Sequence, residues 1–101
     1  MLYQLQVPGP IEDVEELRVL EWHGEPGARF DAGAMIVELE THKAVVEVRA
    51  AQPGVLREIL CAAGDWQKVG RPLAIFSDDA NEAIGRDAAA LAPLLVGFEV
   101  T

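Results

Sequence analysis

Short apolar-rich runs recur from Leu2 to Phe76, and the first of them alternates with polar residues from Tyr3 on, as β-strands that bury one face do. The runs are rich in Leu and β-branched residues, and clusters of Gly, Pro and Asp separate them. We expect strands at residues 2–7, 17–22, 35–40, 44–48, 55–60 and 73–76. Short strands at this spacing are typical of a sandwich or flattened barrel, so the pattern predicts an all-β fold.

An internal repeat divides this region into two similar halves. A shift of 37 residues aligns Glu21 with Glu58, Gly27 with Gly64, and Gly33 with Gly70. Apolar positions follow the same shift, and Leu39, for example, aligns with Phe76. The two halves would therefore share one core. The segment that joins them, residues 40–44, is predicted to be the tip of a hairpin.

The last part of the chain has a different pattern. Asp79 followed by Glu82 can cap a helix, and residues 80–92 are rich in Ala, although Gly85 interrupts them. Pro93 would end the helix, and residues 97–101 alternate again like a final strand. The same Ala- and Pro-containing composition also fits a flexible tether. We therefore expect residues 78–101 to be a short helical or flexible C-terminal extension.

Composition and charge narrow the possible partners. The 101 residues suit one small domain, and the net charge of −9 disfavours nucleic acid and anionic membrane surfaces. Nine carboxylates precede His42, which favours a basic protein surface as partner. No apolar run is long enough to cross a membrane. The single Cys61 and the lack of a signal-like start favour a reducing cytoplasm.

Lys43 is the first candidate for chemistry. The chain has only two lysines, Lys43 and Lys68, and Lys43 stands at the predicted hairpin tip, where its amine would be exposed. Position alone also fits an ordinary solvated turn residue, so the surrounding sequence has to decide.

The residues around Lys43 form an extended series. The chain reads Val19-Leu20-Glu21-Trp22, then Gly27 and Gly33, then Glu40-Thr41-His42-Lys43-Ala44. Beyond the lysine come Val45-Val46-Glu47-Val48, Gly54, Gly64-Asp65 and Val69-Gly70-Arg71-Pro72-Leu73. Over residues 1–77 this series resembles the lipoyl domains of 2-oxo acid dehydrogenase complexes, whose attachment motif is Glu-Thr-Asp-Lys-Ala. The wider group is the biotinyl/lipoyl attachment superfamily.

The resemblance implies a fold, a cofactor and partners. The fold would be a barrel-sandwich hybrid, a flattened β-barrel of two antiparallel sheets with pseudo-twofold symmetry. Lipoic acid would be attached to Lys43, with Glu40, Thr41, His42 and Ala44 as recognition residues. The domain would be a carrier without an active site of its own, such as occurs in dihydrolipoamide acyltransferase components. Its partners would be a lipoyl ligase or lipoyltransferase, a thiamine-diphosphate-dependent decarboxylase, the acyltransferase and dihydrolipoamide dehydrogenase.

Two other functions stay open. Biotin carriers of the same superfamily usually have Met on both sides of the modified lysine, whereas His42 and Ala44 flank Lys43. Lipoate is therefore favoured over biotin. Glycine-cleavage carriers have a similar hairpin but are longer, so they rank third among the carriers. The second function that stays open is an unmodified protein-binding domain. The family's usual Asp is replaced by His42, and the loop at residues 8–13 departs from the usual pattern.

Other residues that often carry chemistry have structural interpretations here. Trp22, Met35 and Cys61 are expected in the core, and Trp66 is expected in a partly exposed turn. His23 and Cys61 are the only other soft ligands, so we expect no metal site. No phosphate-binding glycine loop or nucleophile elbow is present.

Overall fold

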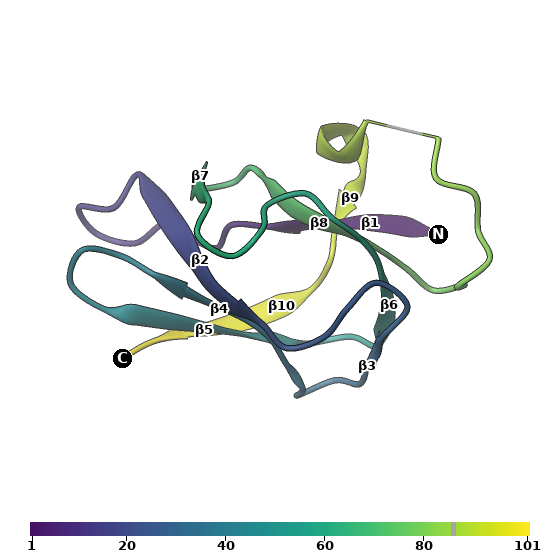
Figure 1. The fold of residues 1–101 in the computed structure, drawn as a ribbon, viewed down its shortest axis with the longest axis horizontal. Coiled ribbons are helices and arrows are strands. Elements are labelled where there is room, and N and C mark those ends of the chain that lie inside the picture. The colour runs from purple at the N-terminus through teal and green to yellow at the C-terminus, as the bar shows by residue number, and fades with distance from the viewer. Residues whose placement is uncertain (86) are drawn as a thin grey trace.

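The computed structural model describes residues 1–85 and 87–101, which form two five-stranded sheets (Figure 1). The first sheet has the order β3-β6-β8-β1-β9 and the second the order β10-β5-β4-β2-β7. The elements are β1 (Leu2–Gln6), β2 (Glu16–Trp22), β3 (Arg29–Phe30), β4 (Met35–Glu40), β5 (Val45–Ala50), β6 (Gly54–Ile59), β7 (Trp66–Lys68), β8 (Pro72–Ser77), the 3-10 turn η1 (Ala88–Ala90), β9 (Ala92–Pro93) and β10 (Val96–Val100). The all-β prediction of two antiparallel-rich sheets is confirmed.

The repeat is visible in the topology. The shift of 37 residues carries β2, β3 and β4 onto β6, β7 and β8, and the order β3-β6-β8 in one sheet becomes β7-β2-β4 in the other. A register irregularity lies between Val19 and Glu21 in the β2–β4 pair and at the equivalent place in the β6–β8 pair. The two halves are therefore related by a pseudo-twofold axis, as predicted.

Each half holds a turn of the other half in place. The N–H of Gly27 donates to the carbonyl of Leu56 at 2.7 Å, and the N–H of Gly64 donates to the carbonyl of Val19 at 2.8 Å. Both glycines have positive φ, 99° and 94°, in the region that L-residues with a Cβ rarely adopt. Reciprocal bonds of this kind lock the turns of one half to the strands of the other.

The core lies between the two sheets and contains side chains from both. Phe76 of β8 is fully buried, and its ring centroid lies 5.8 Å from that of Phe30 in β3. The remaining core side chains are mostly Val, Leu and Ile of the predicted strands, with Cys61 among them. Their inward positions leave the alternate residues of β2, β4 and β5 on the outer face of the second sheet.

The six predicted strands are confirmed, with ends that shift by a residue or two. The final strand is also confirmed: β10 pairs with β5, and Phe98 stands opposite Val48. The sequence pattern missed β3, β7 and β9, which are only two or three residues long. So short a strand carries too little alternation to be recognised.

The helix expected at residues 80–92 is wrong for the described residues of this range, whose only helical element is the 3-10 turn η1 and whose last residue, Ala92, belongs to β9. The side chain of Gln4 donates to the carbonyls of Ala89 and Leu91, and the side chain of Leu91 packs with Leu2 and Ile75. These contacts hold the segment against the first sheet and outweigh a helix propensity that Gly85 already weakens. No helix in the described part of the chain is long and apolar enough to span a membrane.

Candidate functional site at the turn between β4 and β5

Strands β4 and β5 pair antiparallel, with Glu40 opposite Val45, and the four residues between these partners make the turn. His42 and Lys43 are exposed at its tip, whereas Thr41 is buried. Figure 1 places this turn at the left end of the molecule, far from the N-terminus. The predicted hairpin and its exposed lysine are therefore present.

Thr41 organises the turn through its hydroxyl. The N–H groups of Lys43 and Ala44 both donate to Thr41 Oγ1, each at 3.0 Å, and the N–H of Thr41 donates to the carbonyl of Ala44 at 2.8 Å. A single side-chain oxygen thus accepts hydrogen bonds from the N–H groups of both Lys43 and Ala44. In a β-turn without Thr41, these two groups would bond to water instead. The backbone of Lys43 is fixed while its side chain extends into solvent.

Lys43 has no salt bridge to any residue in the described part of the chain. Glu40, the nearest acidic residue in sequence, instead pairs with Arg18 of β2, with 3.4 Å between Nη1 and Oε1. This pair spans β2 and β4 just below the turn. The lysine amine is therefore available to a reagent or an enzyme.

A hollow of about 700 Å³ lies beside the turn. His42 of the turn, the loop before β2 and Trp66 of β7 surround this hollow. The lining residues are Ile11, Asp13, Val14, Glu15, Glu16, His42 and Trp66. The loop is pinned by a bond of 3.1 Å from the N–H of Val14 to the carbonyl of Ile11. Acidic side chains thus lie next to the residue that precedes Lys43.

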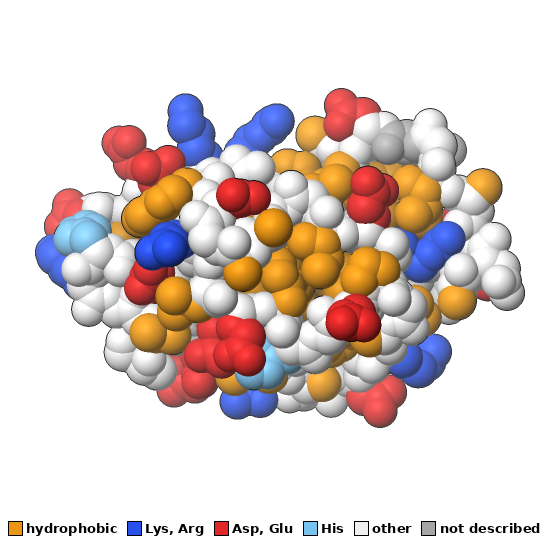
Figure 2. Space-filling view, viewed as in Figure 1, with side chains coloured by type: hydrophobic (Ala, Val, Ile, Leu, Met, Phe, Trp, Pro, Cys, Tyr) orange, Lys and Arg blue, Asp and Glu red, His pale blue; other side chains and the backbone are white. Residues whose placement is uncertain are grey.

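The last residue of the chain also reaches this end of the molecule. Thr101 and Val45 exchange two backbone bonds, with N···O distances of 2.8 Å and 3.3 Å. Strand β10 therefore covers the outer edge of β5 up to two residues from Lys43. The space-filling view shows acidic, basic and histidine side chains together at this end (Figure 2).

The structure places the other singled-out residues as follows. Trp22 is half-buried against the core and donates its Nε1–H to the carbonyl of Cys61 at 2.9 Å, while Trp66 is exposed, although in a strand. Cys61 is buried, and burial, with a smaller effect from the Asp65 carboxylate, raises the pKa of its thiol. Met35 is only half-buried. The raised pKa makes Cys61 a poor nucleophile.

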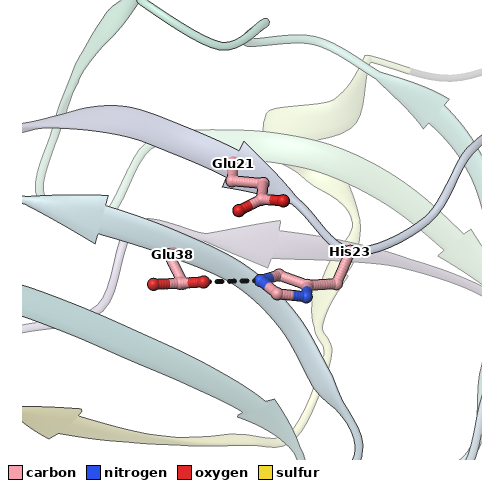
Figure 3. Close-up of side chains that lie close together, drawn as sticks. All are labelled: Glu21, His23 and Glu38. Carbon is pink, nitrogen blue, oxygen red and sulfur yellow. Dashed lines mark hydrogen bonds and ion pairs between the residues drawn. The ribbon is translucent and has the colours of Figure 1, made fainter.

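One group of side chains was not anticipated. Glu21, His23 and Glu38 lie together on the outer face of the second sheet, and His23 Nε2 is 2.7 Å from Glu38 Oε1 (Figure 3). From the sequence, His23 is considered only together with Cys61 as a soft ligand, because His23 and Glu38 are 15 residues apart. A prediction that β2 pairs with β4 would have indicated that these residues lie close together.

Comparison with known proteins gives a consistent family. The sequence model of the family Biotin_lipoyl, described as "Biotin-requiring enzyme", matches residues 3–76. The dihydrolipoyllysine-residue succinyltransferase component of the 2-oxoglutarate dehydrogenase complex of Bacillus subtilis is 35% identical over 80 residues, which are 79% of this chain and 19% of that protein. The same component of Staphylococcus saprophyticus is 39% identical over 75 residues, 74% of this chain and 18% of that protein.

A subunit of a different enzyme component is similar to this chain over a comparable length. The pyruvate dehydrogenase E1 component subunit beta of Rhizobium meliloti is 32% identical over 84 residues, 82% of this chain and 18% of that protein. The chain spans about a fifth of the length of these curated relatives.

Proposed function

This chain belongs to the Biotin_lipoyl family of attachment domains, and we propose that it carries lipoic acid as an amide on Lys43. The observation that carries the proposal is the exposed Lys43 on a turn whose backbone Thr41 holds. The family match spans both halves of the repeat and includes this turn. We therefore propose Lys43 as the attachment site, with Glu40, His42 and Ala44 as recognition residues around it and the buried Thr41 as the recognition residue that acts by shaping the turn.

Two observations favour lipoate over biotin. The residues next to Lys43 are His42 and Ala44, where biotin carriers usually have methionines. The relatives in Bacillus subtilis and Staphylococcus saprophyticus are named as dihydrolipoyllysine-residue proteins. Both observations are independent of the fold, which the two kinds of carrier share.

The residues of the turn suit a covalent arm. The Lys43 amine is exposed and free of salt bridges in the described part of the chain, so an acylating enzyme can reach it. The Thr41 hydroxyl keeps the backbone at Lys43 fixed, which gives a flexible arm a rigid root. Bound lipoic acid would supply a dithiolane that can be reduced and acylated. A tether raises the local concentration of that group at a partner's active site to the order of millimolar.

The proposal extends to the division of the chain and to its partners. Residues 1–77 are the carrier unit, and residues 78–101 are an extension whose β9 and β10 pair with β1 and β5. The carrier would serve a 2-oxo acid dehydrogenase complex, and its partners would be a lipoyl ligase or lipoyltransferase, the decarboxylase, the acyltransferase and dihydrolipoamide dehydrogenase. The names of the relatives support this choice of complex.

Intact-mass measurement tests the proposal. The chain is expressed with a lipoyl ligase and lipoate in one culture and with a biotin ligase and biotin in another. We expect a lipoyl increment in the first and none in the second. The Lys43→Arg variant should stay unmodified, and the matched Lys68→Arg variant should be modified like the parent.

Other results would contradict separate parts of the proposal. A biotinyl increment alone would replace lipoate by biotin and keep the site. A lipoyl increment on Lys43→Arg would move the site, and no increment with either ligase would support an unmodified protein-binding domain.

A further inference from the structure

The pairing of β2 with β4 brings three potential metal ligands to one spot. Glu21 stands opposite Glu38 in the register. The N–H of His23 donates to the carbonyl of Ile36 at 2.8 Å, so the ladder continues past the end of β2 and fixes the backbone of His23. All three side chains project from the same outer face (Figure 3). The three side chains therefore extend from a backbone that the pairing of the strands holds in place.

The distances suit a single ion. One donor atom from each of Glu21, His23 and Glu38 can be chosen so that all three lie within 4.8 Å of one another. Zinc binds imidazole nitrogen and carboxylate oxygen at about 2.0–2.2 Å, so its tetrahedral ligands lie roughly 3.3–3.6 Å apart. Small rotations of the exposed Glu21 and half-buried Glu38 side chains close this difference. His23 Nε2, already 2.7 Å from Glu38, is the nitrogen that faces the carboxylates.

The charges around the group also favour a cation. Glu38 is opposite Glu47 of β5, and Glu47 is opposite Glu99 of β10, so carboxylates form a row across four strands. Like charges on directly opposite residues destabilise a sheet. Within the described residues, no salt bridge neutralises Glu21, Glu47 or Glu99. A divalent ion would offset the charge of this row.

The fold itself does not require this set of residues. The repeat places Glu58, Leu60 and Ile75 at the positions equivalent to Glu21, His23 and Glu38. The backbone bond from His23 to Ile36 has its counterpart between Leu60 and Leu73, at 2.9 Å. The same backbone frame thus carries one potential ligand in one half and three in the other.

We propose that Glu21, His23 and Glu38 bind a divalent transition-metal ion on the outer face of the second sheet. One imidazole and two carboxylates suit Zn²⁺ or a neighbouring first-row ion better than Mg²⁺ or Ca²⁺, which prefer all-oxygen sites. Two carboxylates balance the charge of the ion, and a water molecule can take the remaining position. The site is separate from Lys43 and does not depend on its modification.

Calorimetric titration of the unmodified full chain with Zn²⁺ alone tests the site. We expect saturable binding of one ion with a rise in melting temperature, because a ligand that binds the folded state stabilises it. His23→Gln, which can keep a hydrogen bond to Glu38, should weaken binding at least as much as the roughly 10- to 100-fold loss known for outer-shell partners. Glu21→Gln and Glu38→Gln should also weaken it.

Two control variants make the test specific. Glu58→Gln changes the repeat-equivalent of Glu21, and His42→Gln removes the other histidine, so both should bind Zn²⁺ as the parent does. Melting temperatures without metal should show that all variants are folded. The proposal is overturned if the parent shows no saturable binding, or if His23→Gln binds like the parent. Equal loss in His42→Gln and His23→Gln would also overturn it.

Discussion

The backbone nitrogen of Lys43 lies 3.0 Å from the hydroxyl oxygen of Thr41, two residues earlier in the same turn. The same oxygen accepts the N–H of Ala44, also at 3.0 Å. A buried threonine therefore determines the path of the chain at the one lysine of the turn. The position of the lysine backbone thus depends on a buried side chain.

Replacement of Thr41 by Val should weaken the turn without leaving a cavity, because the two side chains have the same shape. We expect a loss of about 1 to 3 kcal/mol in the free energy of unfolding, since two partly buried N–H groups lose their acceptor. Lipoylation of Lys43 should slow down. Denaturant unfolding and a ligase assay measure the two effects. Thr41→Ser keeps the hydroxyl, and a Ser variant as impaired as the Val variant would contradict the role of the hydrogen bonds.

A second prediction concerns the reciprocal turns of the two halves. Gly27→Ala and Gly64→Ala should each cost on the order of 1 kcal/mol or more, because both positions have positive φ. An added Cβ meets nothing within 4 Å at either position, so the cost is one of backbone conformation alone. Gly97→Ala is the matched control, since its Cβ also meets nothing and its φ is not positive. Equal melting temperatures for all three variants would count against this explanation.

Much of the fold could be predicted because its signals are local. Runs of Leu and β-branched residues, or apolar–polar alternation, mark each strand of five residues or more, and the repeat of glycines marks the turns that need positive φ. The turn at Lys43 was also predictable, since a short motif lies between two clear strands. The backbone bonds to Thr41 follow from residues only two and three positions apart.

The parts that could not be predicted depend on contacts between distant residues. Gln4 holds the carbonyls of Ala89 and Leu91, more than 80 positions away, and nothing near residue 89 indicates that a glutamine will replace the helical hydrogen bonds. The group that includes His23 and Glu38 likewise requires the register of β2 on β4. A histidine considered without its cross-strand neighbour gives no sign of a ligand set.

A third prediction follows from Cys61, whose thiol pKa burial raises above its ordinary value of 9.0. The unfolded chain loses the thiol proton at lower pH than the folded chain. The contribution of Cys61 to stability is therefore complete below the unfolded pKa and is lost as the pH rises through the higher folded pKa. We expect the decline in unfolding free energy above pH 9 to be smaller in Cys61→Ala than in the parent. Urea unfolding at several pH values measures the two slopes. Parallel slopes would show that Cys61 does not contribute.

The last prediction concerns the acidic loop beside Lys43. Asp13 and Glu15 line the hollow that His42 shares, and both are exposed. A ligase or decarboxylase with a basic surface would approach Lys43 through their field, which acts on the rate of association more than on the chemical step. The double variant Asp13→Asn and Glu15→Gln should therefore be modified more slowly at low salt. Asn suits position 13, where φ is 62°, so the loop keeps its shape.

Salt distinguishes steering from damage to the loop. The screening length falls from about 10 Å at 0.1 M to about 3 Å at 1 M ionic strength, so the rates of parent and double variant should converge as salt is added. Glu25→Gln with Glu58→Gln makes the same change in net charge away from the hollow and should leave the low-salt rate close to that of the parent. Lipoylation rates across ionic strength test both expectations. Equal rates for the loop variant and the parent at low salt would refute steering, whereas a slower rate that persists at 1 M would show that the loop contributes by direct contact.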